Sequence, residues 1–203
     1  MVDLHGVSGY EKIATGREGS LFANDLDERR GAVGERVGGG RIAIIGAAGS
    51  IGVATVRALL EFSPKTLALF DLNENGLVEV MRDLRSSPDI RLPEEVFELP
   101  IGLGSVEFER YFREQEPFDF IFNLSAIKHV RSEKDVYCLM RMVDTNVLFL
   151  DDFVRQLHES CTNFFSVSSD KAVNPGNLMG ATKMVMEKVL LMRSDMQHCS
   201  SAR

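Results

Sequence analysis

The feature that most constrains the fold is a repeated alternation of short apolar runs with longer amphipathic segments, beginning at residue 41. Runs that stay apolar without polar alternation are typical of strands buried on both faces, as in a parallel sheet covered by helices. The expected strands are Arg41–Ile45, Thr66–Phe70, Val96–Leu99, Phe118–Leu124 and Asn163–Val167, with helices over 50–62, 74–86, 104–115, 134–158 and 177–195. This order predicts an α/β fold of the Rossmann type, a doubly wound parallel sheet with helices on both faces.

Residues 1–40 differ from the rest of the chain because they are rich in glycine and have no sustained apolar period. We expect them to form an N-terminal arm, with a helix near Leu26–Val37. The three glycines Gly38, Gly39 and Gly40 are expected to act as a hinge between this arm and the domain over 41–203.

Composition excludes several classes of partner. The chain has 23 Lys and Arg against 30 Asp and Glu, a net charge of −7. An acidic total argues against nucleic acid or an anionic membrane as the main partner, since phosphate binding needs a positive surface. The longest uncharged stretch, Ile42–Val56, is too short and too rich in glycine to span a membrane, and no signal peptide pattern is present. Three widely spaced cysteines favour free thiols over disulfides or a metal site, so we expect a cytoplasmic protein without metal.

A glycine-rich junction, Gly46-Ala47-Ala48-Gly49-Ser50-Ile51-Gly52, follows the first expected strand. Between a strand and a helix, the first glycine permits a tight turn, the second lets backbone amides approach a pyrophosphate, and the third allows close packing of helix on strand. The helix is expected to begin near Ser50, with its N-terminus facing the anion. The sequence therefore predicts that Gly46, Gly49, Ser50, Ile51 and Gly52 bind a dinucleotide; a merely flexible turn is the alternative.

Asp71 ends the second expected strand, where a carboxylate can accept hydrogen bonds from the hydroxyls of the adenosine ribose. The same carboxylate would repel a 2′-phosphate, so NAD is favoured over NADP. Asp71 and Glu74 also fit a helix capping box, and Asn73 is a competing cap. The sequence leaves both interpretations open.

The fourth junction contributes small and basic residues to the same edge of the sheet. Ser125 and Ala126 would let a cofactor lie against the backbone, and Lys128 and His129 would place donors beside it, although each alone is more often a solvated surface residue. Asn146 falls inside the long helix expected over 134–158, where asparagine has poor propensity. We expect it to bond backbone at a distortion of that helix and so support the site.

The fifth junction brings a candidate reaction centre. Ser169, Asp170 and Lys171 follow the fifth strand, and Met179 and Lys183 lie one turn apart on the next expected helix, facing the same cleft. Such a cluster shifts the pKa values of its members, and a partly desolvated lysine beside another cation can act as a base near neutral pH. The plain alternative is an exposed turn with an Asp–Lys ion pair.

Residues 41–203 resemble the extended short-chain dehydrogenase/reductases, in particular the CapD-like polysaccharide-biosynthesis branch of nucleotide-sugar 4,6-dehydratases acting on UDP-N-acetylglucosamine. The stretches that carry the resemblance are Gly46–Gly52, Phe70–Asn75, Ser125–Val130, Ser169–Pro175 and Met179–Lys183. Met179 stands where most short-chain dehydrogenases have the tyrosine of Tyr-x-x-x-Lys, as in the membrane-anchored type of dehydratase in this branch.

The resemblance implies a bound NAD or NADP and a UDP-sugar substrate. Lys171 would be the base at C5 of the hexose and Asp170 the acid that protonates the departing C6 hydroxyl. Ser169 would bond the 4-hydroxyl, and Lys183 would hold the nicotinamide ribose. Because Met179 cannot take a proton, Lys171 or Asp170 would serve as the base for oxidation.

Two departures from the family pattern bear on these roles. The loop Leu99-Pro100-Ile101-Gly102 lacks the aspartate that the family usually places near the adenine, so that contact is expected to be lost or made by backbone. Ser201–Arg203 resembles the start of a further strand, after which the family continues into a substrate domain that is not in this chain. We therefore expect a dehydratase or its cofactor-binding portion. The alternatives are a nucleotide-sugar epimerase or C5-inverting dehydratase, and a catalytically silent module; pairing of the long helices predicts a homo-oligomer.

Overall fold

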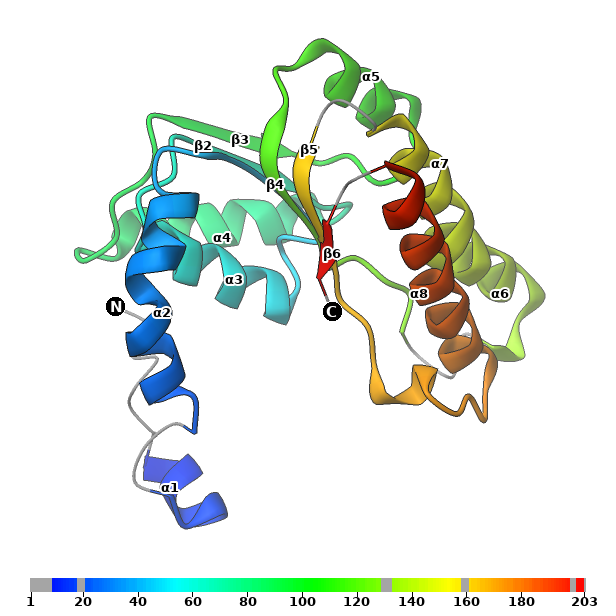
Figure 1. The fold of residues 1–203 in the computed structure, drawn as a ribbon, viewed down its shortest axis with the longest axis horizontal. Coiled ribbons are helices and arrows are strands. Elements are labelled where there is room, and N and C mark those ends of the chain that lie inside the picture. Colours follow the sequence, from blue (N-terminus) through cyan, green and yellow to red (C-terminus); the bar gives the residue numbers. More distant parts are fainter. Residues whose placement is uncertain (1–8, 18–20, 129–132, 158–160, 198–199, 203) are drawn as a thin grey trace.

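Six parallel strands form one sheet in the order β3-β2-β1-β4-β5-β6 (Figure 1). The computed structural model describes residues 9–17, 21–128, 133–157, 161–197 and 200–202. The strands are β1 (Arg41–Ile45), β2 (Thr66–Phe70), β3 (Glu95–Leu99), β4 (Phe118–Asn123), β5 (Cys161–Ser166) and β6 (Ser200–Ala202). The Rossmann-type sheet and its five expected strands are confirmed, and β6 forms where the resemblance places the next strand.

Helices cover both faces of the sheet, and the alternation of side chains along β1 shows how. Ile42 and Ile44 belong to a buried cluster with α3 (Ser50–Leu60) and α4 (Glu74–Ser86). Ala43 and Ile45 belong to a second cluster with α5 (Val106–Glu114), α7 (Phe149–Gln156) and α8 (Leu178–Gln197). Because apolar side chains of the central strand point both ways, both faces must be covered, which the unbroken apolar runs predict.

The prediction of a single helix over 134–158 is wrong, because a π-helical turn divides the helical segment. It forms α6 (Val136–Val143), a π-helical turn (Asp144–Leu148) and α7. Asn146 lies in the π-helical turn and is buried. Its side chain bonds backbone outside the helix, so the distortion expected at this asparagine is confirmed.

The N-terminal arm extends away from the sheet as α1 (Gly9–Thr15) and α2 (Ala23–Val37), so the helix there is longer than expected (Figure 1). The glycine turn after α2 is not a free hinge. The Gly39 amide donates to the Ser63 carbonyl at 3.0 Å, and the Gly40 carbonyl accepts from Lys65 N at 2.9 Å. Val37 is also buried against the α3–α4 cluster. These contacts fix the end of α2 to the domain.

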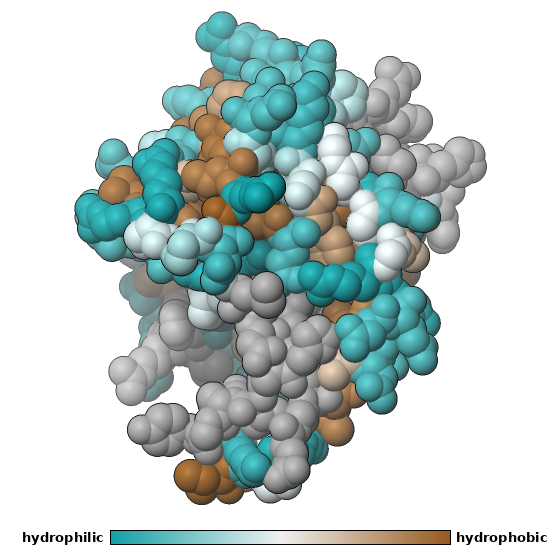
Figure 2. Space-filling view, turned by 90° about the vertical axis from the view of Figure 1, so that its left-hand side faces the viewer, coloured by the Kyte–Doolittle hydropathy of each residue, from teal (hydrophilic) through white to brown (hydrophobic). Residues whose placement is uncertain are grey.

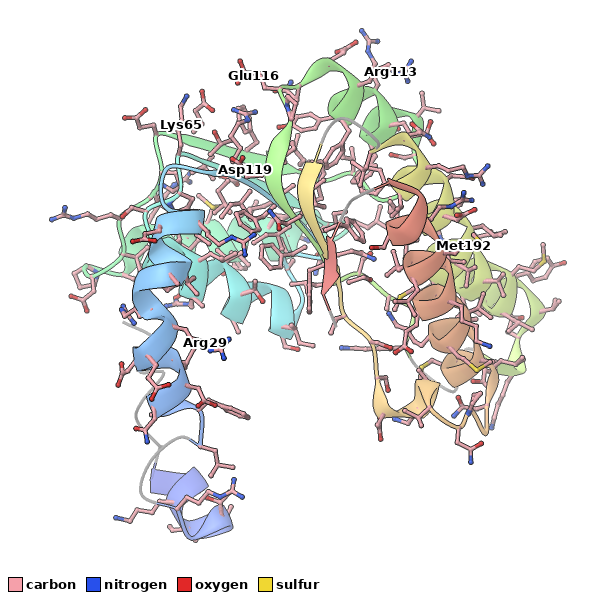
Figure 3. All side chains as sticks on the ribbon, in the orientation of Figure 1. Arg29, Lys65, Arg113, Glu116, Asp119 and Met192 are labelled. Carbon is pink, nitrogen blue, oxygen red and sulfur yellow. The ribbon has the colours of Figure 1, made fainter. Side chains whose placement is uncertain are left out.

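Charged side chains gather at the amino ends of the strands, where Figure 3 labels Lys65, Glu116 and Asp119. The Arg41 amide donates to Asp119 Oδ2 at 2.8 Å, and its guanidinium lies 3.3 Å from Glu95 Oε2. This cluster ties neighbouring strands together. These charged residues therefore stabilise the sheet. They lie at the amino ends of the strands, opposite the carboxyl ends where the motif residues lie.

The outer surface is mixed in polarity. Figure 2, seen from the side of α2 and α4, shows apolar residues gathered at the height of the sheet and hydrophilic residues around them. On α6 and α8, Tyr137, Met140 and Met192 are exposed (Figure 3 labels Met192). The pairing of two copies through these helices stays a prediction. Among the described residues, no helix is long and apolar enough to cross a membrane.

Candidate functional site

A cavity of about 490 Å³ opens at the carboxyl ends of β1, β2, β4 and β5. Its wall combines the glycine-rich junction with residues from the later junctions, as expected for a doubly wound sheet. The expected site residues that line it are Gly46, Gly49, Ile51, Asp71, Ser125, Ala126, Lys128, Ser169, Lys171, Met179 and Lys183. Four others, Ser50, Gly52, Asn146 and Asp170, do not line it, and His129 lies outside the described residues.

The glycine-rich junction has the geometry that its spacing predicts. Gly46 has φ +86°, and a Cβ there would come within 2.7 Å of Ser125 N. A Cβ on Gly52 would collide with the Gly46 carbonyl and come within 2.7 Å of the Ala47 carbonyl. Gly52 therefore packs closely against this turn and does not line the cavity. A side chain at Gly52 would push the first turn of α3 away from β1, and one at Gly46 would push against the backbone of Leu124 and Ser125.

Gly49 differs from Gly46 and Gly52 because a side chain there would extend into the cavity and not into packed backbone. Within the described ranges, a Cβ there would meet only the Gly46 carbonyl, at 3.4 Å. Gly49 is the N-cap of α3 and provides no side-chain cap for the first amides of that helix. Free amides at a helix N-terminus, beside an open wall, form a site that suits a phosphate group.

Asp71 is not the cap of α4. The cap is Asn73, whose Oδ1 accepts from Gly76 N at 3.0 Å. Asp71 Oδ2 instead accepts from Ala48 N at 3.0 Å, and its Oδ1 accepts from Asn73 N at 2.9 Å. The carboxylate thus holds the glycine-rich junction against the end of β2 and lines the cavity, where each oxygen keeps capacity for a further donor.

Asn146 positions the loop after β4. Its Oδ1 accepts from Ile127 N, and its Nδ2 donates to the Ile127 carbonyl and to Thr182 Oγ1, each at 3.0 Å. The loop that carries Ala126 and Lys128 is thereby fixed to α8. The supporting role expected for Asn146 agrees with these bonds.

The turn after β5 forms a short 3-10 helix, Asp170–Ala172, capped by Ser169. The Ser169 hydroxyl donates to Asp170 Oδ1 at 3.0 Å, and this bond, followed by the charge of Lys171, lowers the pKa of the Asp170 carboxyl. A Cβ on Gly180 would lie 2.5 Å from the Lys171 carbonyl, so this glycine lets the turn lie directly on α8. The sequence analysis did not assign a role to Gly180.

Lys183, and not the exposed Lys171, is the desolvated lysine of the site. Its side chain is buried, and its Nζ donates to the Val167 carbonyl at 3.0 Å and lies 3.4 Å from Met186 Sδ. Burial lowers its pKa to about 8, partly offset by the charge of Glu187. Met179 is buried one turn earlier on the same wall.

The buried ammonium predicts a pH dependence of stability. Below pH 8 Lys183 is charged in both states, and the cost of burying the charge is fully present; between pH 8 and 10.5 the folded state releases its proton first, so stability rises with pH. Urea unfolding should show a gain of up to about 3 kcal/mol across this window. Lys183→Met should remove the gain, and equal pH profiles for both proteins would contradict the assignment.

Two residues that the sequence analysis missed, Arg141 and Thr145, also line the cavity. They are four positions apart where α6 meets the π-helical turn, a spacing that places both on one face. With Lys128, Lys171 and Lys183, Arg141 makes the cavity basic, and Asp71 is its one acidic residue among the described lining. A basic cavity in an acidic chain favours an anionic ligand.

Known proteins are similar in sequence to the part of the chain that forms the sheet and the cavity. Residues 42–203 match the family described as "Polysaccharide biosynthesis protein". The membrane protein MJ1061 of Methanocaldococcus jannaschii, itself described as uncharacterized, is 34% identical over 152 residues, 74% of this chain and 42% of that protein. The inverting UDP-N-acetylglucosamine 4,6-dehydratase of Campylobacter jejuni is 28% identical over 153 residues, covering 74% and 42%. A UDP-glucose 4-epimerase of Rickettsia typhi is 27% identical over 156 residues, covering 76% and 43%.

A solved structure, that of Bordetella bronchiseptica WbmF in complex with NAD+, has the same fold, with a TM-score of 0.62 and 13% identity over 81% of this chain and 48% of that one. The chain spans less than half the length of these curated relatives. The family match covers residues 42–203. The chain therefore belongs to the polysaccharide biosynthesis protein family that its motifs resemble.

Proposed function

We propose that the chain is the dinucleotide-binding and catalytic portion of a nucleotide-sugar 4,6-dehydratase, converting UDP-N-acetylglucosamine to a UDP-4-keto-6-deoxy sugar for surface polysaccharide. The observation that carries the proposal is one cavity lined by Gly49 and Asp71 at one end and by Ser169, Lys171 and Lys183 at the other. A ligand that combines a diphosphate and a ribose with a reacting group could contact all of these residues.

The residues present fit NAD. Gly49 leaves space for a pyrophosphate at the uncapped N-terminus of α3, and Asp71 has free acceptor capacity for ribose hydroxyls. A carboxylate here also disfavours a 2′-phosphate, so we propose NAD in preference to NADP. Bound in this cavity, a nicotinamide dinucleotide supplies reversible hydride transfer.

The remaining chemistry is proton transfer by the chain's own side chains. Lys171 would take the C5 proton, which the 4-ketone acidifies, and Asp170 would protonate the C6 hydroxyl as it leaves. Lys183 would hold the nicotinamide ribose and provide positive potential. Both Lys171 and Lys183 line the cavity, which supports these roles.

Asp170 must gain a proton to act as an acid, and its hydrogen bond with Ser169 opposes this. The hydrogen bond from Ser169 is the largest cause of the lowered pKa of Asp170. When the Ser169 hydroxyl turns to the 4-hydroxyl of a substrate, it leaves Asp170 Oδ1, and the pKa of the carboxyl rises. Substrate binding would therefore remove the largest cause that keeps Asp170 deprotonated.

The test is NMR of the product formed from UDP-N-acetylglucosamine by the chain with NAD. A 4-keto-6-deoxy sugar is expected, and Lys171→Met should abolish it while dinucleotide binding persists. Lys188→Met, at an exposed position of α8 outside the cavity, is the matched control. Dinucleotide binding without any product would contradict catalysis by this chain and favour a catalytically silent module.

A nucleotide-sugar 4-epimerase is the second candidate, favoured by the similarity to the Rickettsia typhi epimerase over the same part of the chain. Epimerisation at C4 needs oxidation and reduction at that carbon but no loss of the C6 hydroxyl. A 4-epimer that keeps its C6 hydroxyl in the NMR spectrum would establish this reaction instead.

A further inference from the structure

The end of the cavity beside β3 is apolar. Leu72, Ile101 and Leu103 line it, and Leu103 is buried. The connecting loop, Leu99–Gly104, contains no carboxylate that could accept hydrogen bonds from an exocyclic amine. Apolar walls suit the faces of a purine base but leave the polar edge of the base without partners.

Arg141 lies at this same end. Its guanidinium carbon is 5.4 Å from the centre of the Phe149 ring. Phe149 in turn packs against Gly104, where a Cβ would collide with the ring, and Gly104 directly follows Leu103. Arg141 is exposed and lines the cavity, so its guanidinium can reach a ligand there.

The guanidinium has unused donors. Two other arginines on this side of the sheet, Arg155 and Arg193, both bind Asp151. In the described part of the chain, Arg141 contacts an aromatic ring and forms no salt bridge. Thr145, one turn later on the same wall, has a buried hydroxyl without a hydrogen-bond partner among the described residues. This wall therefore presents polar groups that the protein itself leaves unsatisfied.

We propose that Arg141 recognises the purine base of the bound dinucleotide by donating hydrogen bonds to the acceptors on the base edge that carries N7. The assignment rests on the dinucleotide binding proposed above. With the guanidinium carbon over the Phe149 ring, the N–H groups that do not contact the ring are available to acceptors on the base. The Arg141 donor would thus recognise the base where the loop Leu99–Gly104 has no carboxylate acceptor.

An arginine donor and a carboxylate acceptor at this position predict opposite preferences between adenine and hypoxanthine as the base. On the edge that carries N7, adenine offers an arginine one acceptor, N7, next to the N6 amine that donates. Hypoxanthine offers O6 and N7 together, the pair that arginine binds with two hydrogen bonds in guanine. A carboxylate would instead prefer adenine, because it needs the amine as a donor.

The experiment is calorimetric titration of the 203-residue chain with NAD, with nicotinamide hypoxanthine dinucleotide and with nicotinamide mononucleotide, which lacks the base. The unaltered chain should bind the hypoxanthine dinucleotide about fivefold more tightly than NAD. Arg141→Gln should lose this preference and bind NAD about tenfold more weakly, with mononucleotide binding unchanged. Met140→Ala, a neighbouring exposed position outside the cavity, should behave as the unaltered chain.

The outcomes separate the two proposals. Unchanged NAD affinity in Arg141→Gln, or a preference of the unaltered chain for NAD over the hypoxanthine dinucleotide, overturns the role of Arg141 and leaves dinucleotide binding intact. An unaltered chain that binds none of the three compounds overturns the proposed function and this assignment with it.

Discussion

Replacing Gly49 by valine is expected to abolish dinucleotide binding while the chain stays folded. A Cβ at Gly49 meets one protein atom, the Gly46 carbonyl, at 3.4 Å, so the added side chain extends into the cavity. It would keep a pyrophosphate away from the first amides of α3. Hydrogen bonds to a charged group contribute about 1.5–3 kcal/mol each, so losing two of them lowers affinity at least about a hundredfold.

Calorimetry with NAD measures the affinity, and urea unfolding measures the stability of the same variant. Valine is a poorer N-cap than glycine, so a loss of about 1 kcal/mol in unfolding free energy is expected. A Gly49→Val chain that binds NAD as well as the unaltered chain would show that the glycine-rich junction does not hold the pyrophosphate.

Gly52→Val, in contrast to Gly49→Val, should cause a large loss of stability. Its Cβ would collide with the Gly46 carbonyl and come within 2.7 Å of the Ala47 carbonyl, and both are backbone atoms of the turn that leaves β1. Backbone cannot rotate away as a side chain can, so α3 must separate from the sheet. We expect a loss of about 3 kcal/mol or more in the free energy of unfolding.

Ala54→Val is the matched control, because it adds the same side-chain type at an exposed position of α3. It should cost less than about 1 kcal/mol through helix propensity alone. Equal unfolding midpoints for Gly52→Val and Ala54→Val would contradict the close packing of α3 on β1.

The sheet could be predicted because its strands are continuous apolar runs, and only a structure covered on both faces buries such runs. The π-helical turn was foreseen only as a distortion at Asn146. Its partners, the backbone of Ile127 and the hydroxyl of Thr182, come from elements far apart in sequence. No local pattern specifies such a long-range contact.

The remaining details of the site depend on tertiary placement. Asp71 and Asn73 both fit the sequence signature of a cap, and only the position of Ala48 N beside Asp71 distinguishes them. The π-helical turn adds a residue to one turn and rotates α6 relative to α7 by roughly 100°. Arg141 reaches the cavity from α6, just before this turn, and no motif in the sequence marks it.

The most direct test of the account is calorimetric titration of the unaltered chain with NAD and with NADP. One NAD should bind per chain, and NADP should bind at least about tenfold more weakly, because the Asp71 carboxylate that lines the cavity would repel a 2′-phosphate. Failure to bind either dinucleotide at millimolar concentration would contradict the assignment of this cavity.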